Sequence, residues 1–397
     1  MLSDCQSSYM PDQFNNRTAL LLSVVSLLSS YTAKAQQHDH IIYQAPVVVN
    51  DVSVFKDHGA VPEAGPNTGG RNHGTYGSQY ARLLHVTDDN WIIGYTVSRQ
   101  DGYDRMTPYS DRSTGGLELE IAGSTDNGQH WKKMATISEP GRDLDNAQLI
   151  EARNGDWLLS CRSVRWQESY ILRVYRSTDK GRDWVRFGVI DSTAGSPGSL
   201  GRPDKGIYEP HLCYLDNGNL SVMYANERHV IEHPSYNQII SQKISTDGGR
   251  TWGRESWVAF EPCGGMARPG MPVWAKMKNG KYVVIYEICG PDKCQVYFKT
   301  SDDGMNWPAG LGTKIPDQVG GPYITSLKDG RLLVTSNIGN VSVSDDFGKT
   351  WTLTDRPWAQ TLWGSIYEGA KDQLFFVNSV ARKEGGNNIQ IKAATIR

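Results

Sequence analysis

An eight-residue pattern, Ser/Thr-x-Asp-x-Gly-x-x-Trp, occurs five times in this chain of 397 residues. The copies begin at Ser124, Ser177, Ser245, Thr300 and Ser344. Each copy predicts a tight turn between two strands: the Asp side chain accepts hydrogen bonds from backbone amides, Gly takes a positive φ, and Trp packs beneath the loop. Five copies predict a repeated β-structural unit, and they indicate a structural role for the motif itself.

A second repeat alternates with the first and occurs six times: an apolar run, a polar turn and another apolar run, which is typical of a β-hairpin. The turns are Asp89-Asn90, Asn154-Gly155, Asn217-Gly218, Asn279-Gly280, Asp329-Gly330 and Asp372-Gln373. Four strands per unit and six units predict an all-β fold, a six-bladed β-propeller, whose last blade takes a strand from each end of the mature chain. A stacked pair of β-sandwiches would not produce this period. The 41 Gly, 12 Trp and 19 Tyr against 8 Phe also favour turn-rich β structure.

Residues 1–35 are expected to be a signal peptide, and residues 36–397 the propeller domain. Arg17 precedes an apolar run from Ala19 to Leu28, and Ala33-Lys34-Ala35 is a small-residue cleavage pattern. Because the run is shorter than the roughly twenty residues that span a bilayer, we expect a secreted or periplasmic protein with no membrane anchor after cleavage. In such a compartment Cys289 and Cys294 are the best placed to form a local disulfide.

The charge balance excludes several classes of function. The 41 basic and 43 acidic residues leave a formal net charge of −2, which argues against a nucleic-acid-binding protein. No Cys/His spacing resembles a zinc site, and the Gly pairs lack the strand-to-helix context of a phosphate loop. We therefore expect no metal and no cofactor, and, as for many closed propellers, a monomer.

The register of the hairpin repeat predicts which side chains meet at the end of the propeller opposite the turns, where the axial funnel binds ligands. Counting nine residues back from each turn gives Ala81, Asn146, Glu209, Met271, Gly321 and Gly364. Counting back eight, or forward seven, adds Arg82, Arg162, Glu287 and Asn337 among others. Two carboxylates, Glu209 and Glu287, thus arrive at one mouth from neighbouring blades, surrounded by polar side chains.

Paired carboxylates across a sugar-sized funnel are what glycoside hydrolysis requires: one is the general acid, and the other is the nucleophile or the base for a water. The alternative is an Arg–Glu network that closes the propeller axis and has only a structural role. We take the catalytic interpretation as the hypothesis to test.

Over residues 45–397 the sequence resembles the sialidase-type propellers, whose hallmark is the Asp-box repeat described above. Segments Tyr80–Leu83, Tyr208–Pro210, Ala267–Pro272 and Tyr286–Gly290 more closely resemble the family-93 glycoside hydrolases, which are retaining exo-α-1,5-L-arabinanases. This resemblance implies an oligo- or polysaccharide substrate and a catalytic pair formed by Glu209 and Glu287.

The resemblance leaves open which member of the pair is the nucleophile; as a working assignment we take Glu287 as nucleophile and Glu209 as acid/base. Two further residues of the same blades, Arg268 and Glu227, are expected at or just behind the substrate.

Two other interpretations stay open at this point. An exo-α-sialidase would clamp the substrate carboxylate with Arg82, Arg162 and Arg268. It would use Tyr367 as nucleophile beside Glu209, and an acid chosen from Asp101, Asp104 and Asp111. A non-catalytic glycan-binding propeller would instead stack sugars on aromatic side chains. The candidates are Tyr103, Tyr109, Trp166, Tyr236 and Trp363, whereas Trp274 is expected in the core.

Overall fold

The computed structural model describes residues 41–50, 77–98, 117–165, 167–196, 198–201, 205–383 and 386–396. The chain divides into two units, Met1–His38 and Asp39–Arg397, and every described residue belongs to the second. The predicted signal peptide lies outside the described residues, as do the candidate sialidase acids and Tyr103, Tyr109 and Trp166. None of the helices in the described ranges is long and apolar enough to cross a membrane.

Four sheets contain four antiparallel strands each, in sequence order. The first is β7 (Asp143–Glu151), β8 (Trp157–Arg165), β9 (Ser169–Ser177) and β10 (Val185–Ala194). The second is β11 (Ile207–Tyr214), β12 (Leu220–Asn226), β13 (Ile239–Ser245) and β14 (Ser256–Ala259). The third is β15 (Arg268–Lys276), β16 (Tyr282–Cys289), β17 (Gln295–Ser301) and β18 (Thr313–Val319). The fourth is β19 (Tyr323–Ser326), β20 (Leu332–Thr335), β21 (Ser342–Ser344) and β22 (Thr352–Leu353).

The remaining strands form one nine-stranded sheet that joins the two ends of the described chain. One part is β3 (Gly77–Thr87), β4 (Asn90–Ser98), β5 (Leu117–Ser124) and β6 (Lys132–Ile137). The other is β23 (Ser365–Glu368), β24 (Gln373–Ala381) and β25 (Asn387–Ile396), with β1 (Ile41–Tyr43) and β2 (Val47–Val48) paired on β25. A single parallel pair, Asn387 with Gly77, connects the two parts. Strands from both ends therefore share a sheet, as the sequence predicted.

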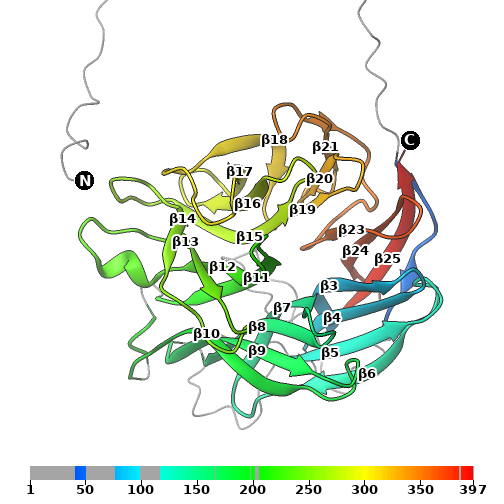
Figure 1. Cartoon of the computed structure of the whole chain (residues 1–397), viewed down its shortest axis with the longest axis horizontal. Coiled ribbons are helices and arrows are strands. Elements are labelled where there is room, and N and C mark those ends of the chain that lie inside the picture. The colour runs from blue at the N-terminus through cyan, green and yellow to red at the C-terminus, as the bar shows by residue number, and fades with distance from the viewer. Residues whose placement is uncertain are drawn as a thin grey trace, which may run out of the picture. The chain divides into compact units, whose positions relative to one another are not determined.

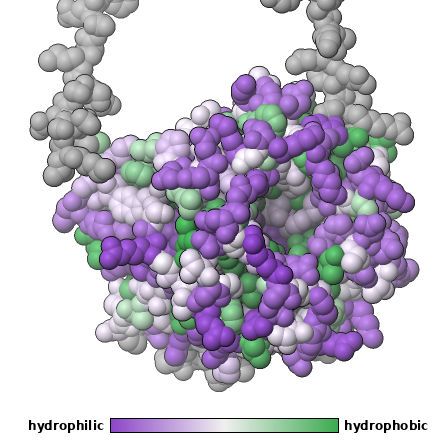
Figure 2. Space-filling view, viewed as in Figure 1, coloured by the Kyte–Doolittle hydropathy of each residue, from purple (hydrophilic) through white to green (hydrophobic). Residues whose placement is uncertain are grey.

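The all-β prediction is confirmed, and the helix among these elements, a 3-10 turn η3 (Arg228–Ile231), has only four residues. The six predicted hairpins are also present as strand pairs. Their first strands contact one another in the order β3, β7, β11, β15, β19 and β23, and β23 contacts β3. Figure 1 shows these strands surrounding a common centre, with the later strands of each sheet lying outward. Figure 2 shows that this face is hollowed near the centre and has a mostly hydrophilic rim.

The five Asp-boxes lie between the third and fourth strands of their sheets. In the first, Ser124 Oγ accepts a hydrogen bond from Gly128 N at 2.9 Å, and Trp131 Nε1 donates to the Gly128 carbonyl at 3.0 Å. The Ser–Gly bond recurs at 2.8, 2.7, 2.9 and 2.8 Å in the other copies. These contacts hold the turn without reaching the mouth of the fold, which agrees with a structural role.

The fourth Asp-box differs from its prediction by one residue. Its capping pair is Ser301 and Asp303, whose side chains are joined at 3.0 Å, rather than Thr300 and Asp302. Asp303 accepts amide hydrogen bonds from the two residues that follow Gly304, each at 2.8 Å. The turn is therefore one residue shorter than in the other four copies, and the sequence pattern placed its Ser and Asp one residue too early.

At the mouth, each of the six hairpins presents one residue in the left-handed region, just inside or just before its first strand. These are Tyr80 (φ 52°), Asn146 (57°), Glu209 (60°), Met271 (52°), Gly321 (51°) and Trp363 (52°). In β3, β7, β11 and β15 the strand register shifts at this point, which is the signature of a β-bulge. A bulge re-aims the side chain and the amide of its residues out of the ladder. Six such residues, here called the bulge residues, thus face the same end of the fold.

The residue count from sequence located four of the six bulge residues and missed two by one position. Tyr80 and Trp363 occupy the places predicted for Ala81 and Gly364. The reason is that the two turns without an Asn-Gly or Asp-Gly pair fall one residue earlier than assigned. The first turn is at residues 88–89, and the last is at Lys371 and Asp372, both of which have positive φ.

Candidate active site

Glu209 and Glu287 come from neighbouring sheets and face one small space. Glu209 is the bulge residue of β11, whereas Glu287 lies in β16 directly opposite Gly270 of β15. A Cβ atom placed on Gly270 would lie 3.7 Å from Glu209 Oε2 and 3.8 Å from Glu287 Oε1. The two carboxylate oxygens therefore cannot be farther apart than these two distances combined. The structure thus brings together the two carboxylates that the register argument paired.

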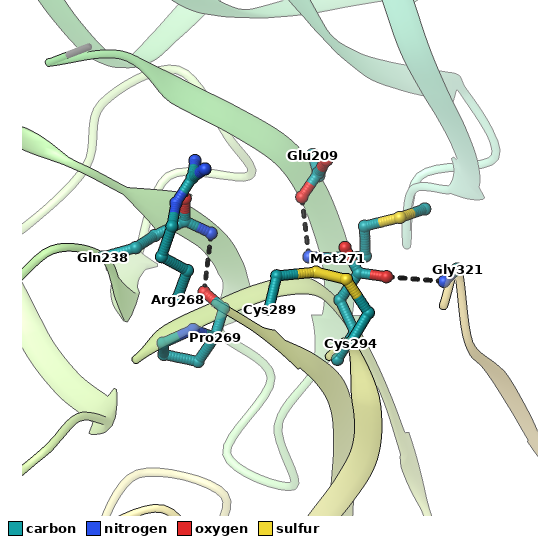
Figure 3. The surroundings of a disulfide bond; sticks show 9 residues. Glu209, Gln238, Arg268, Pro269, Met271, Cys289, Cys294 and Gly321 are labelled. Carbon is teal, nitrogen blue, oxygen red and sulfur yellow. Dashed lines mark hydrogen bonds between the residues drawn. A yellow bond between two sulfur atoms is a disulfide. The ribbon is translucent and has the colours of Figure 1, made fainter. Parts of the chain in front are cut away.

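Backbone amides of the next bulge residue hold each carboxylate. Met271 N donates a hydrogen bond to Glu209 Oε2 at 2.6 Å, and Gly321 N donates to Glu287 Oε2 at 2.7 Å. Figure 3 shows the first of these bonds beside the Arg268 side chain and the disulfide. Since each amide is fixed by the strand that carries it, the position of each carboxylate is set by the neighbouring sheet.

The surroundings of the two carboxylates raise the pKa of each. They therefore favour the protonated form, whereas an exposed glutamate is ionised at neutral pH. Burial, and then the negative charge of Glu287, raise the pKa of Glu209 to about 7, against the smaller lowering effects of the Met271 amide, Arg162 and Arg268. Burial also raises the pKa of Glu287, and the Gly321 amide and Arg268 oppose this. At neutral pH Glu209 therefore exchanges a proton easily, as a general acid and base must.

Arg268, at the start of β15, is the accessible cation of this group, with a side chain 43 % exposed. Its Nη2 donates to Glu227 Oε1 in a short contact and to Gln238 Oε1 at 2.9 Å. Glu227 is almost fully buried, and its other oxygen accepts a hydrogen bond from Tyr208 Oη at 3.0 Å. Glu227 thus lies behind Arg268 and fixes its guanidinium next to the carboxylate pair.

Arg162 and Asn146 lie on the other side of Glu209. Arg162 Nη2 pairs with buried Asp145 Oδ2 at 2.8 Å, and its guanidinium lies 5.7 Å from the centre of the Tyr208 ring. Asn146 N donates to Asp145 Oδ1 at 2.7 Å. Both predicted residues therefore reach the mouth, but each is buried and anchored by the same aspartate.

Arg82 and Tyr367 are placed differently from their prediction. The Arg82 side chain is 1 % exposed: its guanidinium lies 4.0 Å from the Tyr80 ring centre and 5.0 Å from that of Tyr323, and its Nη1 donates to the Trp363 carbonyl at 3.0 Å. The Tyr367 ring packs 5.2 Å from that of Tyr323, and its hydroxyl is buried. Both groups are therefore buried against aromatic rings, Arg82 against Tyr80 and Tyr323, and the Tyr367 hydroxyl beside Tyr323.

Asn337 links two sheets. Its Oδ1 accepts a hydrogen bond from Trp363 N at 2.8 Å, so a third bulge amide is held by a side chain of the preceding sheet. Of the aromatic residues considered as sugar platforms, Tyr236 packs against Trp257, with ring centres 4.9 Å apart, and Trp274 is buried, as expected for the core.

The predicted disulfide between Cys289 and Cys294 is present. Glu287 lies close to it: one of its oxygens and the two sulfur atoms all lie within 4.8 Å of one another. This is the one group of three potential metal ligands among the described residues. Because the two sulfurs are bonded to each other, they are not available to bind a metal. The disulfide instead lies beside the Glu287 carboxylate.

Sequence reasoning missed two kinds of contributor to the site. The first is the set of bulge amides, which no side-chain pattern reveals. The second is the pair Gln238 and Gly270: Gln238 Nε2 donates to the Pro269 carbonyl at 2.8 Å while its Oε1 holds Arg268. The run Arg268-Pro269-Gly270 was visible as a motif, but its sequence does not show that Gly270 faces both glutamates.

Neither a protein-family model nor a curated protein matches this sequence. Solved structures do. The GH93 α-L-arabinofuranosidase of Fusarium graminearum, in complex with arabinobiose, superimposes with a TM-score of 0.66 at 19% identity, over 88% of this chain and 97% of that one. The Penicillium chrysogenum α-L-arabinanase complexed with arabinobiose gives 0.64 at 18% identity, over 80% and 92%.

The NanB sialidase of Streptococcus pneumoniae gives a TM-score of 0.57 at 11% identity, over 85% of this chain and 71% of that one. The fold is that of the sialidase-type propellers. At these sequence identities, the similarity to solved structures establishes the fold alone, and this fold agrees with the one expected from the Asp-boxes. The chemistry therefore has to be argued from the site itself.

Proposed function

We propose that this protein is an exported glycoside hydrolase that releases short sugars from a chain end with retention of configuration. The observation that carries the proposal is the pair of buried glutamates facing one space, each held by a backbone amide of the next sheet. Retaining hydrolysis needs two carboxyl groups about 5–5.5 Å apart, one ionised and one protonated. A group with a pKa of about 7 beside a second carboxylate meets the second requirement.

In the proposed mechanism Glu209 is the acid/base and Glu287 the nucleophile. Glu209 donates its proton to the leaving glycosidic oxygen while Glu287 attacks the anomeric carbon, which gives a covalent glycosyl-enzyme. Glu209, now ionised, takes a proton from a water molecule; that water attacks the anomeric carbon and releases Glu287 as carboxylate. Arg268 stabilises the ionised forms of both residues, since it lowers the pKa of each.

The scaffold of this proposal is a closed ring of six blades. The cyclic order of contacts among the six first strands supports it, as does the sharing of one sheet by both ends of the described chain. In this proposal the single bridge between Asn387 and Gly77 marks the boundary between the last blade and the first.

We propose an α-1,5-linked L-arabinan or a related polymer as the substrate. The support is the resemblance of the motifs around both glutamates to the family-93 enzymes, together with the fold shared with two proteins solved with arabinobiose. The sialidase alternative requires three arginines open to a carboxylate. Here Arg82 is covered by tyrosine rings and Arg162 is buried against Asp145, so Arg268 alone of the three is accessible.

The decisive experiment incubates the purified protein with linear α-1,5-arabino-oligosaccharides and, in parallel, with sialyl-lactose, and follows the products by NMR. We expect arabinobiose or arabinose, first seen as the anomer of the substrate. Release of sialic acid would replace this proposal with the sialidase alternative, and binding without turnover would replace it with a lectin-like function.

Variants then test the assigned roles. E209Q and E287Q should each lower kcat by about 10²-fold or more, because each removes a proton-transfer or nucleophilic group. In an E287A variant, azide should restore turnover by attacking from the vacated side and give a glycosyl azide of inverted configuration. A retained-configuration azide in E287A, with inversion in E209A, would exchange the two roles.

A further inference from the structure

We propose that Gly270 forms the floor of the subsite that binds the reacting sugar ring, and that its lack of a side chain determines whether a sugar can reach both glutamates. This inference rests on the proposed function and adds a specificity-determining residue to it. Gly270 lies in β15 between Arg268, which carries the accessible cation, and Met271, whose amide holds Glu209.

The geometry around Gly270 carries the argument. A Cβ at this position would lie in van der Waals contact with one oxygen of each glutamate, at 3.7 and 3.8 Å. The reacting carbon of a bound sugar must come to about 3–3.5 Å from the attacking oxygen, and the leaving oxygen must come within about 2.6–3.2 Å of the acid. A methyl group touching both carboxylates therefore competes for the volume that the reacting atoms need.

Backbone conformation does not account for glycine at this position. Gly270 is absent from the residues with positive φ, whereas its neighbour Met271 has φ 52°. A glycine with ordinary β-strand dihedrals weakens a strand and usually marks a close approach of a ligand or another backbone. The closest atom to the hypothetical Cβ is Gln238 Nε2, at 2.7 Å, at the end of a buried side chain that hydrogen bonds to Pro269 and Arg268 hold in place. The remaining near neighbours are the two carboxylates.

The four consecutive residues 268–271 each contribute a different contact to this place. Arg268 supplies the guanidinium, Pro269 a carbonyl that accepts from Gln238, Gly270 a position without a side chain against which the Gln238 amide packs, and Met271 an amide for Glu209. Figure 3 shows Arg268, Gln238 and Pro269 on one side of Glu209 and the disulfide in front. The segment is thus arranged around a ligand, and Gly270 is its one position without a side chain.

The test is G270A, with Q238A and the double variant Q238A/G270A as partners. Alanine at 270 displaces Gln238, so Q238A measures that effect alone, and the double variant has no atom closer than the two carboxylates to the new methyl group. Q238A should itself lower activity, because it removes the Gln238 contact to Arg268, and it serves as the reference for the double variant. We expect G270A, compared with wild type, and the double variant, compared with Q238A, each to lose at least about 10²-fold in kcat/KM, the scale of loss that a misplacement of about 1 Å causes.

Two further measurements distinguish a Gly270 that forms the floor of the sugar subsite from one that only maintains the fold. The melting temperature of Q238A/G270A should match that of Q238A, and G253A, a change at an exposed glycine between β13 and β14, should leave activity at the wild-type level. Affinity for arabino-oligosaccharide, measured by calorimetry in the E287Q background, should fall at least tenfold on adding G270A.

The proposal is overturned if Q238A/G270A is as active as Q238A, or if it loses activity only in proportion to a lower melting temperature. A wild-type protein that cleaves no glycoside would refute the proposed function but not this inference, because the calorimetric comparison does not depend on turnover. Unchanged affinity on adding G270A would refute the inference even in an active enzyme.

Discussion

Replacing Glu209 by glutamine should make the folded protein more stable at neutral and alkaline pH. The structure raises the pKa of Glu209 from an ordinary value of 4.5 to about 7. Between these values the native state binds a proton that the unfolded state has lost, so the free energy of unfolding falls as pH rises through this window. Above pH 7 the ionised carboxylate therefore carries its full energetic penalty, and below 4.5 it carries none.

The magnitude follows from the size of the pKa change. One pKa unit corresponds to about 1.4 kcal/mol, so a rise to about 7 corresponds to about 3 kcal/mol. Glu209 retains some contact with solvent, which reduces this figure, and we expect a gain of about 1–3 kcal/mol for E209Q at pH 8. Glutamine keeps an oxygen to accept the hydrogen bond from Met271 N, so the variant loses the charge and retains the geometry.

The assay is urea denaturation of wild type and E209Q at pH 4 and pH 8, with equal slopes checked so that midpoints can be compared. The stability difference should be present at pH 8 and close to zero at pH 4. E151Q, which changes an exposed glutamate at the end of β7, is the matched control and should show no such pH-dependent gain. If E209Q is no more stable than wild type at pH 8, burial of the ionised Glu209 carboxylate does not destabilise the fold, and the reasoning is refuted.

Three further perturbations test the surroundings of the pair. E227Q should free Arg268 from its ion pair, so that the arginine lowers the pKa of the two glutamates less than before. The acidic limb of the pH–activity profile should therefore move to higher pH, with little change in melting temperature. C289S/C294S should cost about 2 kcal/mol in denaturation, from the entropy of a six-residue loop, and should lower kcat because Glu287 lies beside the bond. K299M should cost at least about 3 kcal/mol in the same assay, since the buried ammonium donates to three backbone carbonyls that would lose their donor.

The fold was predictable because its signals are periodic. Asp-boxes and hairpin turns recur along the chain, so each strengthens the assignment of the others, and the disulfide partners are close in sequence. Errors arose where the periodic signal weakens. The two turns lacking an Asn-Gly or Asp-Gly pair were displaced by one residue, as was the shortened Asp-box with Asp303.

The site was predictable only in part, because register fixes where a backbone goes and not what surrounds a side chain. It brought Glu209 and Glu287 to one mouth. It also placed Arg82 there, although the bulge turns Tyr80 over the guanidinium and buries it. Whether an arginine at the mouth is open or covered depends on aromatic residues from other sheets, such as Tyr323, that no local pattern connects to it.

The bulge residues explain how one device serves both fold and chemistry. Each of these six residues lies at a bulge, in β3, β7, β11 and β15, or just before the first strand, at β19 and β23, so its amide is available outside the ladder. In three sheets that amide donates a hydrogen bond to a side-chain oxygen of the preceding sheet, which belongs to Glu209, Glu287 or Asn337. The contact that joins neighbouring sheets is therefore the same contact that positions the two carboxylates. A change that loosens the packing of one sheet against the next should accordingly alter the activity of the site before it unfolds the protein.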